Sequence, residues 1–109
     1  MAFDEGLAER IRARLGTDPA VTEKRMFGGL SFLYRGNLAV GVIGDEMIVR
    51  VGPDSTDAAL ARTGTRLFDF TGRPMRGWVV VEAPALSEDD ALADWIDQGC
   101  SFASGLPSK

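Results

Sequence analysis

The segment Gly72–Trp78 holds the side chains that are best suited to binding another molecule. Arg73, Met75, Arg76 and Trp78 all fall within this short stretch. Tryptophan, methionine and arginine are enriched at protein interfaces, and tryptophan and arginine dominate binding hot spots. The same composition also suits a hairpin loop whose arginines are solvated and whose tryptophan lies in the core. The favoured interpretation is a surface for a protein partner, which the sequence does not identify.

A second candidate segment is expected to contact the same protein partner, and it could instead bring the backbone close to an anion. Its members are Arg25, Met26, Phe27, Gly28 and Gly29. The glycines would permit a close approach, and Lys24 and Arg25 would supply positive charge. The same glycine pair equally suits a bulge or tight bend that needs positive φ. A small-anion or nucleotide site therefore stands as the alternative function, and its residues would be Arg25, Gly28, Gly29, Arg73 and Arg76.

The sequence contains no histidine and only one cysteine, Cys100, which excludes several enzyme mechanisms. Without imidazole there is no Ser–His or Cys–His activation of a nucleophile, and one thiol cannot supply a thiolate metal cluster. The acidic run Glu88–Asp90 starts a predicted helix, where carboxylates stabilise the helix dipole, so we interpret it as structural. Cys100 lies beside an apolar stripe and is expected to be packed and unreactive. We expect no enzyme activity, no metal and no cofactor.

The elements that position these residues begin with an amphipathic helix. Phe3, Leu7, Ile11 and Leu15 follow one another at i+4 spacing, which predicts a helix from about residue 3 to 15. Gly16 suits its C-terminal cap.

From residue 23 to 51 the apolar period changes to two, which predicts an antiparallel meander of four strands. Its predicted turns are Gly28-Gly29, Arg35-Gly36-Asn37 and Gly44-Asp45. The small residues Ala39 and Gly41 indicate a close approach by a helix backbone.

The second half of the sequence predicts a short helix, two strands and a long final helix. The run Val79–Val81 is continuous and β-branched, so its strand should be covered on both faces. For the last helix, Ser87 is the predicted N-cap, with acidic residues in the first turn. Gly105 is expected to adopt the left-handed conformation that ends many helices.

The predicted order is α-β-β-β-β-α-β-β-α. This order indicates a single α+β domain over residues 1–109. We expect a two-layer sandwich, in which helices from both chain ends pack on one face of an antiparallel sheet of five or six strands.

Charge and composition limit the partners. The formal net charge of −4 repels phosphate backbones at long range, so we expect no direct DNA binding by this chain alone. The acidic start of the chain and the lack of a long apolar run predict a cytoplasmic protein without membrane association. Exposed sheet edges would also permit a homodimer.

Several strings of the sequence are similar to those of one protein family. They are Arg25-Met26-Phe27-Gly28-Gly29, Tyr34-Arg35-Gly36-Asn37, Met47-Ile48-Val49-Arg50-Val51, Gly72–Trp78, Trp95 and Leu106–Lys109. Over nearly its whole length the chain resembles the N-terminal domain of the TfoX/Sxy competence-regulator family, in particular its small stand-alone members. It departs from that family before the last helix, where only Pro84 of the usual four-residue segment is kept.

The resemblance implies a two-layer α+β fold and supplies no catalytic residues. It also implies a role in transcriptional regulation of DNA uptake, where full-length members act beside another transcription factor. Those members carry a second, C-terminal helical domain that these 109 residues do not contain. We therefore expect a regulatory or adaptor-like binding domain.

Overall fold

The computed structural model describes residues 3–16, 18–26, 28–69 and 75–107, without the side chains of Met26 and Met75. Within these ranges the chain forms three α-helices, two short 3-10 helices and six strands. In chain order they are α1 Glu5–Leu15, β1 Val21–Met26, β2 Gly29–Tyr34, β3 Asn37–Ile43, β4 Glu46–Arg50, η1 Pro53–Ser55, α2 Thr56–Leu60, β5 Thr65–Phe68, β6 Met75–Val81, η2 Ala83–Leu86 and α3 Asp89–Ser104. The predicted order of helices and strands is confirmed.

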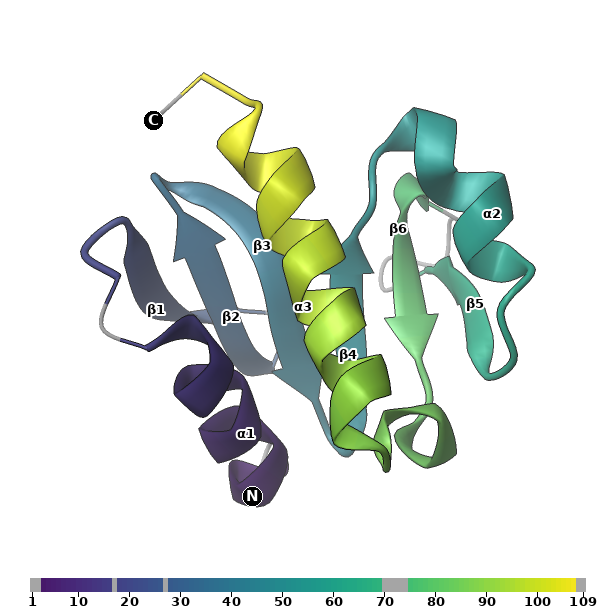
Figure 1. Ribbon diagram of the computed structural model, residues 1–109, viewed down its shortest axis with the longest axis horizontal. Coiled ribbons are helices and arrows are strands. Elements are labelled where there is room, and N and C mark those ends of the chain that lie inside the picture. Colours follow the sequence, from purple (N-terminus) through teal and green to yellow (C-terminus); the bar gives the residue numbers. More distant parts are fainter. Residues whose placement is uncertain (1–2, 17, 27, 70–74, 108–109) are drawn as a thin grey trace.

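The six strands form one antiparallel sheet in the order β1-β2-β3-β4-β6-β5. β1 and β5 are the two edge strands, because β6 inserts between β4 and β5. Helices α1 and α3 cover one face, with α3 lying across the middle of the sheet and α2 beside β6 (Figure 1). This is the α+β arrangement that the sequence predicts.

The main core lies between α1, α3 and the sheet. Alternate residues of the central strands point toward the helices, as the period of two requires. Val40, Met47 and Val49 are fully buried there beneath Trp95 and Ile96 of α3.

α3 approaches β3 closely at Gly99. A Cβ on Gly99 would lie 2.5 Å from the carbonyl oxygen of Ala39, so only glycine fits without displacement. The predicted helix approach near Ala39 therefore occurs. Gly41, in contrast, faces β2, where a Cβ would lie 3.2 Å from the carbonyl oxygen of Leu30.

The opposite face of the sheet carries a smaller apolar cluster. Ile48, Phe68 and Val80 are buried there, and Trp78 packs against them in a half-buried position. Val79 and Val81 lie in the main core, so the strand Val79–Val81 is covered on both faces as predicted.

The strand connections agree with the turn signals in the sequence. Arg35 and Gly36 have φ of 51° and 85° and form a two-residue turn between β2 and β3. Gly44, at φ 57°, begins the two-residue turn between β3 and β4. These positive values explain the glycines, because side chains rarely tolerate that conformation.

Two predictions for the last helix are wrong. Glu88, not Ser87, occupies the N-cap position of α3, because Ser87 is the C-cap of the 3-10 helix η2. The hydroxyl of Ser87 donates to the carbonyl oxygen of Pro84, 3.1 Å away. Gly105 has φ −82°, so it ends the helix in a right-handed conformation.

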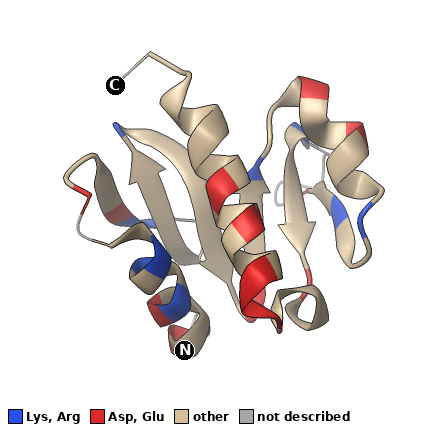
Figure 2. Ribbon diagram, viewed as in Figure 1, with Lys and Arg blue, Asp and Glu red and all other residues tan. Residues whose placement is uncertain are grey.

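Ion pairs hold α3 from both sides. Arg10 and Arg14 of α1 pair with Asp89 and Asp97, and Arg62, which follows α2, pairs with Asp94 at 2.8 Å. In Figure 2 the basic bands of α1 accordingly lie beside the acidic bands of α3. Much of the protein's charge is thus engaged between its own elements.

Candidate functional site

The two segments predicted to bind a partner lie far apart. Arg25 pairs with Leu30, and the row continues through Val42 and Met47 to Val81. Four strand spacings therefore separate β1 from β6, or about 19 Å. Trp78 lies farther along β6, toward the opposite end of the sheet.

The side chains of Arg25 and Trp78 also lie on different faces of the sheet. The guanidinium of Arg25 lies over the ring of Phe3 in the main core, whereas Trp78 packs against the cluster on the other face. No single small anion could contact both Arg25 and Arg76 across this distance, so among the described residues of the predicted anion site the two arginines are not brought together.

The turn between β1 and β2 is built for strand packing. Gly28 has φ +76°, which explains a glycine there, while Gly29 begins β2. A Cβ on Gly29 would lie 1.9 Å from the carbonyl oxygen of Val42. The close approach is therefore made by a neighbouring strand. Phe27 lies outside the described residues.

The first residues of β6 depart from regular strand geometry and contact α2. Arg76 is exposed and lies 3.4 Å from the carboxylate of Asp57, a long and weak ion pair. Gly77 has φ +96° and accepts hydrogen bonds from the backbone N–H groups of Val51 and Gly52. Arg73 lies outside the described residues, as does the side chain of Met75.

A buried hydroxyl holds this region together. Thr56 is fully buried, and its Oγ1 accepts from the N–H of Gly77 at 2.9 Å and donates to the carbonyl oxygen of Gly52 at 2.8 Å. The side chain therefore joins the end of β4 to the start of β6 through the first turn of α2. This bridge fixes the position of the residues on either side.

Those residues form an arginine–aromatic group that we call the Trp78 site: Arg50, Trp78 and Phe102. The guanidinium carbon of Arg50 lies 4.9 Å from the centre of the Trp78 ring system and 5.4 Å from that of the Phe102 ring. Both distances fall in the range of cation–π contacts. Burial lowers the pKa of Arg50, because desolvation disfavours the charged form.

Arg50 differs from most arginines of this protein. Six of the described arginines pair with carboxylates: Arg10, Arg12, Arg14, Arg62, Arg66 and Arg76. Within the described residues, Arg25, Arg35 and Arg50 have no carboxylate partner and contact aromatic rings instead. Of these three, only Arg50 contacts two rings.

Sequence reasoning found Trp78 but missed Arg50, Phe102 and Thr56. A signal for Arg50 exists, since it interrupts an apolar strand on the same face as Ile48. A signal for Phe102 also exists, since it follows Trp95 by two helical turns. Nothing in the sequence distinguishes Thr56 from a surface threonine.

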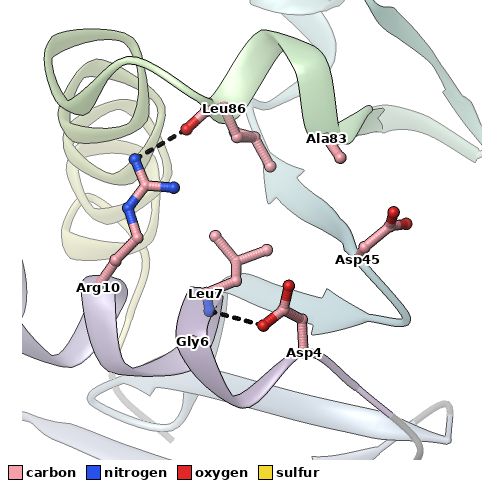
Figure 3. A pocket seen from close by; sticks show the side chains of 7 residues that line it. All are labelled: Asp4, Gly6, Leu7, Arg10, Asp45, Ala83 and Leu86. Carbon is pink, nitrogen blue, oxygen red and sulfur yellow. Dashed lines mark hydrogen bonds between the residues drawn. The ribbon is translucent and has the colours of Figure 1, made fainter.

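The structure also contains shallow pockets, of which Figure 3 shows one of about 340 Å³ between α1, η2 and the β3–β4 turn. Its polar groups serve the fold: Arg10 donates to the carbonyl oxygen of Leu86 at 2.8 Å, and Asp4 accepts from the N–H of Leu7. Asp45 also lines it. Of the residues predicted to bind a partner, none that the structure describes lines this pocket.

The other chemical candidates have structural roles. Asp89 and Asp90 lie in the first turn of α3, and Asp89 pairs with Arg10. Cys100 is half-buried, and burial, with a smaller effect of Asp97, raises the pKa of its thiol. The described residues contain no group of three or more side chains arranged to hold a metal ion.

None of the helices in the described ranges combines the length and the apolar character that a bilayer span requires. A family model described as the TfoX N-terminal domain matches residues 13–103. Comparisons with curated proteins and with solved structures found no match.

Proposed function

Because this chain belongs to the TfoX N-terminal domain family, we propose that it is a non-catalytic regulatory or adaptor-like domain that binds a protein partner. The domain would span residues 1–109 and contact its partner through the Trp78 site and the adjacent Arg76. A link to transcriptional control of competence is part of this proposal, through the family alone.

The observation that carries the proposal is the half-buried position of Trp78 beside an arginine without a carboxylate partner among the described residues. Tryptophan and arginine are the side chains that contribute most to binding hot spots. The Thr56 bridge holds their strands in place, which lowers the entropic cost of binding. The turn between β1 and β2 contributes less to the proposal, since Gly28 is explained by its positive φ and Gly29 by strand packing.

The test is affinity capture with two charge-reversed variants, Arg76→Glu and Lys24→Glu. Both side chains are exposed, and each variant makes the same charge change, at the start of β6 or on β1 respectively. We expect Arg76→Glu to lose the captured partner and Lys24→Glu to keep it, with melting temperatures near that of the wild type. Equal capture by wild type and Arg76→Glu would contradict the proposal.

A further inference from the structure

Arg50 presents a charged group whose hydrogen-bonding capacity is unused within the described residues. It ends β4 and is partly buried, and its guanidinium makes no hydrogen bond or ion pair with any described side chain or backbone group. A guanidinium carries five N–H donors in a planar fork. A partly desolvated fork of this kind is suited to an acceptor from another molecule.

The neighbouring rings determine which part of Arg50 remains available. Trp78 and Phe102 both lie within cation–π distance of the guanidinium carbon, and Phe68 supports Trp78 at a ring separation of 6.4 Å. Where a guanidinium stacks parallel to a ring, its N–H edge stays free to donate hydrogen bonds. The site thus offers a flat row of donors beside apolar rings.

The position of the Phe102 ring depends on the glycine at position 52. A Cβ on Gly52 would lie 2.4 Å from the Phe102 ring, so glycine at this position lets the ring rest against the chain after β4. Gly52 also has φ +88° and accepts from Thr56. The site is therefore formed before any ligand binds.

We propose that the Trp78 site binds a single carboxylate of the protein partner, from an aspartate or glutamate next to an apolar residue. This inference rests on the proposed function and specifies the chemistry of the partner. A carboxylate accepts two parallel hydrogen bonds from one guanidinium, and its apolar neighbour would pack on Trp78 and Phe102.

Charge argues against a phosphate or a nucleic acid at this site. Phosphate recognition commonly uses an arginine cluster, whereas Arg50 is the one arginine among the described residues whose guanidinium lies over Trp78 and Phe102. The chain as a whole carries a net charge of −4, which repels phosphate groups at long range. A monovalent carboxylate needs only Arg50.

The direct test is an NMR titration of the wild-type protein with the peptide acetyl-Gly-Glu-Phe-Gly-amide. The chain contains two tryptophans, and Trp95 is buried in the core, so its indole resonance is an internal reference. We expect saturable shifts of the Trp78 indole N–H and the Arg50 Nε–H, with Trp95 unchanged. The peptide with glutamine in place of glutamate should bind at least tenfold more weakly, and inorganic phosphate should not compete.

The matched variants are Arg50→Lys and Arg35→Lys. Lysine keeps the charge but lacks the planar fork. Arg35 also contacts a ring, that of Tyr34, but lies on the β2–β3 turn. We expect a tenfold or greater loss of peptide affinity for Arg50→Lys and no loss for Arg35→Lys, with the Trp95 resonance confirming that both variants are folded.

Three results would overturn the inference: no saturable shift in the wild type, equal binding of the glutamine peptide, or stronger binding of phosphate. The proposed function would survive each of them if Arg76→Glu still loses the partner. Conversely, unchanged capture by Arg76→Glu would remove the proposed function whatever the peptide does.

Discussion

Gly29 and Val42 are packed so closely that no side chain fits between them: a Cβ on Gly29 would lie 1.9 Å from the Val42 carbonyl oxygen. Gly28, its neighbour, has open space around it and only an unusual φ of +76°. Two adjacent positions that look alike in the sequence therefore require glycine for different physical reasons.

We expect Gly28→Ala to cost about 1 kcal/mol, the usual price of a left-handed L-residue. Gly29→Ala should cost more than about 3 kcal/mol or prevent folding, because β2 and β3 must separate. Urea denaturation of both variants measures the difference. Equal stabilities would show that the two strands are not in close contact at this point.

Gly99→Ala sets helix propensity against packing. Alanine in a helix interior is favoured over glycine by about 1 kcal/mol. The added Cβ would, however, lie 2.5 Å from the Ala39 carbonyl oxygen, so we expect a net destabilisation of about 2 kcal/mol. The control is Ser101→Ala on the exposed side of α3, which should change stability by less than about 0.5 kcal/mol. A stabilised Gly99→Ala variant would be inconsistent with the observed helix position.

Thr56→Val tests the buried bridge between β4 and β6. Valine has nearly the same shape but leaves the N–H of Gly77 and the carbonyl oxygen of Gly52 without partners, at a cost of about 2 kcal/mol. Thr56→Ser keeps both hydrogen bonds and loses one methyl group, at about 1 kcal/mol. Thermal and urea unfolding should therefore rank serine above valine, and the reverse order would show that the hydroxyl contributes little.

The pair Arg12–Glu23 predicts a change of stability with acid. Hydrogen bonding to Arg12 holds the pKa of Glu23 below its ordinary value of 4.5. A carboxylate with a lowered folded-state pKa contributes stability above its unfolded-state pKa, and this contribution is lost as the pH falls through the folded value.

Glu23→Gln should accordingly be less stable than the wild type at pH 7, by less than about 1 kcal/mol because both side chains are partly exposed. The difference should disappear near pH 2, where both chains are uncharged at this position. Chemical denaturation across this pH range provides the measurement. A difference that persisted at low pH would have to arise from something other than the ion pair.

Local patterns in the sequence predicted the sheet well. Gly44 and the alternating apolar residues on either side of it indicate a two-residue turn between strands. The run Val79–Val81 indicates a strand that is buried on both faces. Each of these patterns is formed by residues that are close together in the sequence, so it can be recognised without knowing the fold. The prediction of Ser87 as the N-cap of α3 is wrong because Ser87 is the C-cap of the 3-10 helix η2.

The candidate site was predictable only in part. Trp78 can be singled out from the sequence because of its residue type. The candidate binding site, however, also needs Arg50 from β4 and Phe102 from α3, which come together with Trp78 only through tertiary packing. Similarly, the separation of β1 from β6, four strand spacings or about 19 Å, is set by the strand order β1-β2-β3-β4-β6-β5. Strand order of this kind is not encoded in any local pattern.

Helix α3 follows every strand in the chain, yet it lies over β2, β3 and β4 in the middle of the sheet (Figure 1). During synthesis on the ribosome these strands emerge well before the helix that covers them. The apolar side chains of Val40, Met47 and Val49 then face water and other nascent chains until α3 leaves the exit tunnel. A chain that ends before Asp89 should therefore expose this apolar face of the sheet and aggregate more readily than the chain with α3.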